Sequence, residues 1–116
     1  MDIGLRNYLL GFRNRDSDMR LKNVVYFELL RRGYDVAIGK VGNAEIDFIA
    51  AKADEKIYVQ VTESMESETV RARELAPLQG IADNYEKIVL SLHPGLETSY
   101  DGIKSIDLIE WLLENQ

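Results

Sequence analysis

The chain has 116 residues, of which 46% are hydrophobic, and a formal net charge of −6. A chain of this size buries about two-thirds of its unfolded surface, so we expect a single domain over residues 1–116. The acidic total argues against strong non-specific nucleic-acid binding, the absence of cysteine excludes disulfides and thiolate sites, and no apolar run approaches the ~20 residues that cross a bilayer.

Charge is unevenly distributed along the chain. Residues 1–42 carry eight Lys or Arg against five acids, and residues 43–116 carry six against fifteen. A solvated charged surface is the simpler interpretation, although a local basic patch can still contact a nucleic-acid backbone. The N-terminus lacks the basic-then-apolar order of a signal peptide, so we expect a soluble, cytoplasmic protein without membrane contact.

The first half of the chain predicts two helices and a three-stranded meander. Residues 4–11 predict a short helix, and residues 19–32 a long one that ends at Gly33, a residue typical of helix C-termini. The predicted strands cover residues 34–41, 45–50 and 56–62. Short polar turns join them, which favours antiparallel pairing.

The second half predicts a helix, two strands and a closing helix, over residues 66–85, 87–92, 103–106 and 107–115. Pro77 is expected to kink or restart the first of these helices, and Asp107 to cap the last one. The single histidine, His93, precedes Pro94 in a predicted loop and receives no role. The predicted fold is an α/β protein with an α-β-β-β-α-β core, a mixed central sheet flanked by helices, and a β-α tail.

Two acids stand among apolar residues in these predicted elements. Asp47 lies inside the strand 45–50, although ionised carboxylates are rarely placed against a core without a partner. Glu28 lies in line with Leu21 on the core-facing side of the long helix. Pairing with Arg32, four residues further on, is the simpler explanation for Glu28.

The strand alternation places Asp47 and Gln60 on faces that can be the same one. If the helix with Glu28 packs over that face, three oxygen-bearing side chains converge. Two carboxylates and an amide oxygen form the hard-ligand set that Mg²⁺ or Mn²⁺ prefers. The residues therefore predict a candidate site for a divalent metal.

The inward Glu28, the "IDF" of residues 46–48, the "VQVT" of residues 59–62 and the order of elements together resemble the PD-(D/E)xK, or restriction-endonuclease-like, nuclease superfamily. A narrower resemblance covers nearly the whole chain. It is carried by "GLRNYLL", "NVVYFELLRRGYDVAIGKVGNAEIDFIA", "IYVQVTES", "RELAPLQGI" and "DGIKSIDLIEWLL". These segments are similar to the C-terminal domain, of unassigned function, of a large prokaryotic family of AAA-type ATPases.

The nuclease resemblance implies a metal held by Asp47, Glu28 and the backbone carbonyl of Val61. Gln60 stands where the superfamily usually has a second acid, and an amide oxygen can still coordinate. Thr62 stands where the superfamily has a lysine that activates water or stabilises charge. Catalysis would then need a cation from elsewhere.

Lys40 and Arg32 are better placed by sequence than Lys52 to supply that replacement cation.

Three alternatives for the function of the chain stay open. The first is a non-catalytic binding or regulatory module whose partner is the ATPase region of a larger protein. The chain is then either cut from the C-terminus of that protein or a free-standing gene product. The second is a Mg²⁺- or Mn²⁺-dependent DNA nuclease with a relocated lysine. The third is a buried ion-pair network of Glu28, Arg32 and Asp47 that serves only the fold.

The sequence does not identify all the partners of the chain. It contains no GxxxxGK[ST] run, so any ATPase activity would belong to another part of a longer protein. DNA stays open as a partner, and so does the oligomeric state. An exposed edge strand such as residues 34–39 offers one way for two copies to pair.

Overall fold

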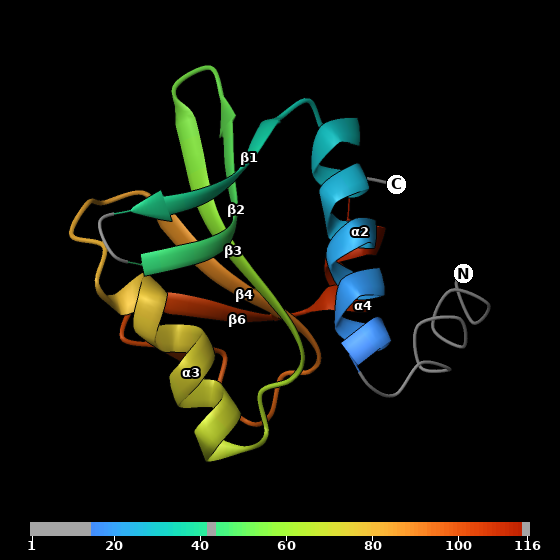
Figure 1. The fold of residues 1–116 in the computed structure, drawn as a ribbon, viewed down its shortest axis with the longest axis vertical. Helices are drawn as coiled ribbons and strands as arrows, with labels where there is room; N and C mark the ends of the chain where they lie inside the picture. Colours follow the sequence, from blue (N-terminus) through green and yellow to red (C-terminus); the bar gives the residue numbers. More distant parts are fainter. Residues whose placement is uncertain (1–14, 42–43, 115–116) are drawn as a thin grey trace.

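The computed structural model of the protein describes residues 15–41 and 44–114. Its elements are α2 (Arg15–Arg31), β1 (Asp35–Val41), β2 (Ala44–Lys52), β3 (Glu55–Ser64), α3 (Glu68–Gln79), β4 (Glu86–His93), β5 (Ser99–Tyr100), β6 (Ile103–Asp107) and α4 (Leu108–Leu113). The strands form one six-stranded sheet in the order β1-β2-β3-β4-β6-β5 (Figure 1). The protein is therefore a mixed α/β protein with helices flanking a central sheet, as the sequence predicts.

The sheet is mixed in direction. β1, β2 and β3 are antiparallel neighbours, whereas β4 is parallel to β3 and β6 is parallel to β4. The predicted meander is confirmed, and the chain follows the predicted order of helix, three strands, helix and strand. The two-residue strand β5, antiparallel to β6, was not predicted. The helix predicted over residues 4–11 lies outside the described residues.

The ends of α2 and α4 follow local capping chemistry. Gly33 adopts a φ of +94°, and the N–H groups of Gly33 and Tyr34 donate to the carbonyls of Leu30 and Leu29, at 3.0 and 3.1 Å. Asp107 caps α4 as predicted, because its carboxylate accepts from the first free N–H groups of that helix. No helix in the described ranges is long and apolar enough to cross a membrane.

The helix α3 is shorter than the predicted 66–85. It begins after its N-cap, Ser67, and ends at Gln79. Pro77 lies inside its last turn and has no N–H to donate to the carbonyl of Arg73. The predicted extension to residue 85 is therefore wrong, since the helix stops within a turn of the proline.

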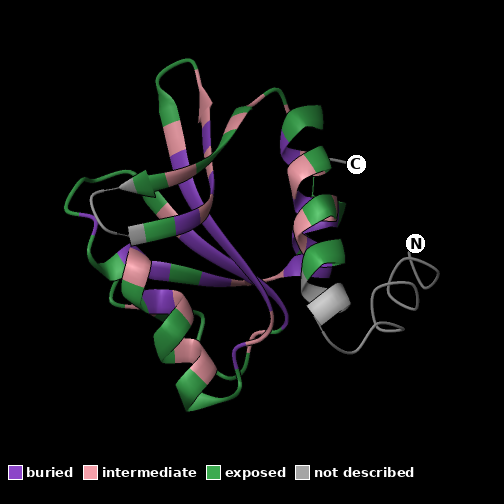
Figure 2. Ribbon diagram, viewed as in Figure 1, coloured by how far each residue is buried: buried purple, intermediate pink, exposed green. Residues whose placement is uncertain are grey.

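Two apolar clusters lie on opposite faces of the sheet. α2 and α4 cover one face, and α3 covers the other (Figure 1). The first cluster is centred on Leu21, Val25, Leu29, Phe48, Val59, Leu90 and Trp111. The second is centred on Ile46, Tyr58, Met65, Leu75, Leu78 and Val89. β3 and β4 are buried along most of their lengths (Figure 2), because both of their faces are covered.

A β-bulge in β2 breaks the alternation of its side chains. Ala37 of β1 pairs with Ile49 and Gly39 pairs with Ile46, so Asp47 and Phe48 together lie opposite the single residue between them on β1. Ile46 and Ile49 both pack with the cluster under α3. Phe48 turns the other way, into the cluster under α2. The bulge therefore re-aims the Asp47–Phe48 pair toward α2.

Candidate functional site around Asp47

Asp47 lies where β2 and β3 stop pairing through their backbones. The ladder between these strands runs from Lys52 and Glu55 to Phe48 and Val59. At the next pair of residues, Asp47 and Gln60, side-chain hydrogen bonds replace the backbone ladder. The Asp47 N–H donates to Gln60 Oε1 at 2.8 Å, and the Val61 N–H donates to Asp47 Oδ2 at 2.9 Å. The two side chains thus satisfy backbone groups that the diverging strands leave open.

Gln60 connects three elements at this point. Its side chain is buried, with 5% of the residue exposed. While Oε1 accepts from Asp47 in β2, the Gln60 Nε2 group donates to the carbonyl of Glu74 in α3, at 3.2 Å. Both ends of the amide therefore have protein partners, which is the usual condition for burying such a group.

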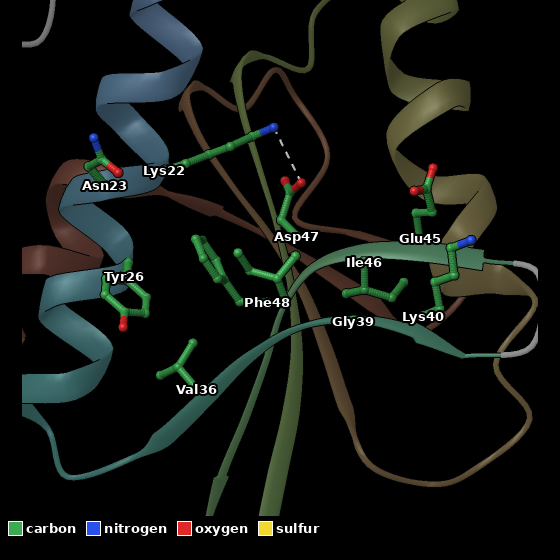
Figure 3. A pocket seen from close by; sticks show the side chains of 11 residues that line it. Lys22, Asn23, Tyr26, Val36, Gly39, Lys40, Glu45, Ile46, Asp47 and Phe48 are labelled. Atoms are coloured by element: carbon green, nitrogen blue, oxygen red, sulfur yellow. Dashed lines mark ion pairs between the residues drawn. The ribbon is translucent and has the colours of Figure 1, made fainter.

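Lys22 of α2 completes the surroundings of the Asp47 carboxylate. Its Nζ lies 3.3 Å from Asp47 Oδ1, while Oδ2 is held by the Val61 N–H. Figure 3 shows the lysine reaching from α2 across to the carboxylate. The Lys22 side chain is 41% exposed and that of Asp47 21% exposed. The ion pair is thus partly shielded from water on the strand side and open on the lysine side.

Glu28 is held at a different place from Asp47. Its carboxylate accepts from Arg31 at 2.7 and 2.9 Å and from Arg32 at 2.7 Å. The hydrogen bonds from Arg31 chiefly, with those from Arg32, lower the pKa of Glu28 below its usual value, although burial opposes the shift. Arg32 also stacks over the ring of Trp111 in α4, 4.3 Å from its centroid. Glu28 therefore belongs to the contact between α2 and α4.

The expectation that Glu28 joins Asp47 and Gln60 is not met, for a geometric reason. Lys22 and Glu28 lie on opposite flanks of the buried stripe of α2, roughly 120° apart around the axis and about 9 Å apart along it. The flank of Lys22 faces β2, and the flank of Glu28 faces α4. Gln60, in turn, points toward α3 on the opposite face of the sheet.

The remaining residues of the sequence motif are engaged in the fold. Val61 packs its side chain in the cluster under α2 and uses its N–H to bind Asp47. Thr62 is buried, with 5% of the residue exposed, and pairs with Ser91 of β4. Neither position supplies a cation to the site.

The three cations that the sequence offered as replacements have different surroundings. Arg32 is occupied by Glu28 and Trp111. Lys52 donates to the carbonyl of Arg32 at 3.0 Å and lies over Tyr34. Lys40 lines the same groove as Asp47, opposite Glu45 on the neighbouring strand. The sequence analysis missed Lys22, the cation that does contact Asp47.

The Asp47–Lys22 pair lies in a groove of about 840 Å³ between α2 and the β1–β2 hairpin. Aromatic and aliphatic side chains from the helix and both strands form part of its wall: Tyr26, Val36, Ile46 and Phe48 (Figure 3), together with Ile38. Ile38 is 81% exposed, and β1 is an edge strand of the sheet. The groove therefore combines an open strand edge, an exposed apolar rim and one ion pair.

The residues at Asp47 do not fit a divalent metal as they stand. No group of three or more His, Cys, Asp or Glu side chains that could hold a metal occurs among the residues with described positions. One oxygen of Asp47 faces an ammonium group, and the other accepts a backbone N–H. The amide oxygen of Gln60 also accepts a backbone N–H. The expected ligands are thus already bonded to protein donors.

Comparison with known proteins finds a relative that is much longer than this chain. An uncharacterized protein of Haemophilus influenzae is 44% identical over 114 residues, which are 98% of this chain and 28% of that protein. The chain thus spans about 28% of the length of the curated relative that it matches. No family model matches the chain, and no solved structure matches it.

Proposed function

We propose that the chain is a nuclease-like domain that has lost catalysis and serves as a binding or regulatory module of a larger protein with an ATPase region. The observation that carries the proposal is the bonding of Asp47 and Gln60. Hydrolysis of a phosphodiester needs a metal or an equivalent group to activate water and stabilise charge. In this chain the side chains at the corresponding positions hold two strands and a helix together.

Two further observations support this proposal. The order of helix, three antiparallel strands, helix and parallel strand agrees with the core that the resemblance implies. The relative from Haemophilus influenzae extends well beyond the matched region, as expected for a domain within a longer polypeptide.

The groove beside β1 is the surface that we assign to this binding role. Its occupant would be an apolar segment from the rest of the longer polypeptide, whose length outside the matched region is nearly three-quarters of the relative. Ile38, which lines the groove from β1, is 81% exposed. A segment laid beside β1 would also satisfy the open backbone groups of the edge strand.

Copurification tests the binding role. The remaining portion of the Haemophilus influenzae relative is expressed separately and mixed with this chain, with Ile38→Asp or with Leu96→Asp. We expect the unchanged chain and Leu96→Asp to bind and Ile38→Asp to lose binding, because Leu96 is 99% exposed on a loop away from the groove. Equal binding by the two variants would remove the groove from the proposal.

A second candidate function is a metal-dependent DNA nuclease that uses Lys22 as a relocated lysine. The observation in its favour is the Lys22 ammonium 3.3 Å from Asp47, where a charge-stabilising group would be needed. DNA is incubated with Mg²⁺ or Mn²⁺ and the unchanged chain or Asp47→Ala. We expect no cleavage from either protein. Cleavage that disappears in Asp47→Ala would establish the nuclease and overturn the non-catalytic proposal.

A further inference from the structure

We infer that the ammonium group of Lys22 is a built-in cation that takes the place of a divalent ion at Asp47 Oδ1, the carboxylate oxygen that faces the groove. The inference rests on the part of the proposed function that treats Asp47 as a former metal ligand. It goes further by naming the residue responsible, which lies outside the sequence motif. It also predicts that an acid at position 22 creates a divalent-metal site.

The first step concerns the charge around the Asp47 carboxylate. One oxygen is bound to a backbone N–H of β3, and the other faces the groove and contacts Lys22. The carboxylate side chain is only 21% exposed, so its charge needs a partner close by. The lysine supplies that partner from a separate element. A dication at the same oxygen would lie within a few ångströms of the ammonium and be repelled by it.

The second step concerns the oxygen atoms near this position. Asp47 Oδ1 faces the groove, and Glu45 lines the same groove on the same strand. Gln60 supplies no ligand here, because its amide oxygen accepts from the Asp47 N–H and its side chain lies on the α3 side. Mg²⁺ and Mn²⁺ bind through carboxylates, carbonyl-type oxygens and water. The groove therefore offers Asp47 Oδ1 as one hard oxygen ligand, and the missing component is a second carboxylate close to it.

The third step concerns the reach of position 22. A glutamate side chain is one bond shorter than lysine, so its oxygens would stop about 4–5 Å from Asp47 Oδ1 if it followed the same path. An ion with two metal–oxygen bonds of about 2.1 Å spans roughly that gap. Lys22 lies on the flank of α2 that faces β2, and Figure 3 shows its side chain extended along this path to the carboxylate.

Manganese binding to the purified chain tests the inference, with Mn²⁺ alone as the probe. Calorimetry and electron paramagnetic resonance are compared for the unchanged chain, Lys22→Glu and Lys22→Gln. We expect no saturable binding at millimolar Mn²⁺ for the unchanged chain. Lys22→Glu should bind at least roughly tenfold more tightly, and the gain should vanish in the Lys22→Glu, Asp47→Asn double variant.

Lys40→Glu is the matched control, because Lys40 lines the same groove and the change adds the same charge without touching Asp47. It should leave Mn²⁺ binding unchanged. Equal gains for Lys22→Glu and Lys40→Glu would show a general effect of charge and overturn the inference. So would saturable binding by the unchanged chain, or no gain in Lys22→Glu.

Circular dichroism verifies that each variant is folded. If Lys22→Glu does not fold without metal, Lys22→Gln decides instead. Removal of the ammonium alone should then permit weak Mn²⁺ binding that Asp47→Asn abolishes, and its absence would overturn the inference. A chain that fails to bind the rest of the longer protein would disprove the binding role and leave the metal result unaffected.

Discussion

Glu28 illustrates how a charged residue on a mostly apolar helix is stabilised by its own neighbours. Only 10% of its side chain is exposed, and two arginines surround it. Arg32 continues the contact to α4, where it stacks on Trp111. A glutamate that stands among apolar residues in the sequence is therefore explained by ion pairing, which was the simpler of its two interpretations.

The acid stability of the protein should depend on Glu28. Because its pKa is lowered in the folded protein, its ionised form stabilises the fold above its usual pKa of 4.5, and this contribution is lost as the pH falls through the lowered value. Glu28→Gln should therefore lower the free energy of unfolding by about 1–3 kcal/mol at pH 7. The difference from the unchanged protein should shrink below pH 4.5.

Urea unfolding at a series of pH values measures this dependence. Glu97→Gln, at an exposed loop position, serves as the control and should change little at any pH. A difference for Glu28→Gln that stays constant down to strongly acidic pH would contradict the proposed role of the ion pair.

At the scale of single residues, the sequence located part of the site. It identified Asp47 as an acid needing a partner and paired its strand with that of Gln60, because short turns fix an approximate register. The expected shared face is wrong, since Asp47 points toward α2 and Gln60 toward α3. The prediction placed Glu28 at the site and did not consider Lys22, although both flank the same buried stripe. Which flank faces β2 depends on where α4 packs. A contact between elements so far apart in the sequence cannot be predicted from local sequence patterns.

At the scale of elements, Gln60 is the joint between β2, β3 and α3. Its amide oxygen and nitrogen have different partners, and an ionised carboxylate at this position could accept but not donate. The position therefore favours glutamine over the acid found in the nuclease motif.

Gln60→Glu should destabilise the protein by about 1–3 kcal/mol at pH 7, because a carboxylate cannot donate to the Glu74 carbonyl and adds a charge beside Asp47. Urea unfolding measures the change. Gln79→Glu is the surface control, since Gln79 is exposed at the end of α3 and donates to the exposed Asp101 at 3.3 Å, so the same change should cost less than about 1 kcal/mol there. Comparable losses in the two variants would show that Gln60 has no special structural role.

The order and type of the described elements followed from the sequence, whereas several details did not. Periodicity and turn residues gave the meander, the helix before it and the capped closing helix. The bulge at Asp47–Phe48 was not visible, because one inserted residue reverses the alternation without changing the composition of the strand. The end of α3 was missed since apolar spacing continues past Pro77 to Ile81 and Tyr85, although the helix does not.

At the scale of the whole molecule, one sheet separates two apolar clusters and shares its strands between them. Val59 and Leu90 face the first cluster, while Tyr58 and Val89, their neighbours in sequence, face the second. Each cluster thus uses the same backbone ladder as its base. We expect the two halves of the core to unfold together.

Leu78→Ala tests this expectation from the side of α3. Removing this fully buried side chain should cost about 2–5 kcal/mol. Trp111, the single tryptophan, reports on the opposite cluster. Its fluorescence midpoint in urea should fall together with the midpoint of circular dichroism, and Leu96→Ala should move neither. A fluorescence midpoint that stays in place while circular dichroism shifts would indicate two independent units.

β2 separates from β3 beyond Asp47, and this separation divides the sheet into two parts. The arm is the start of β2 with the part of β1 that pairs with it, and the body is the rest of the sheet. Past that residue, the end of β2 pairs with β1, and the end of β3 pairs with β4. A swing of the β1–β2 arm would leave every ladder intact. Among the described contacts, it would disturb those of Asp47, Gln60 and Lys22 and the packing of Ile46 under α3. A ligand that binds between α2 and the arm would therefore change the angle between the arm and the body of the sheet.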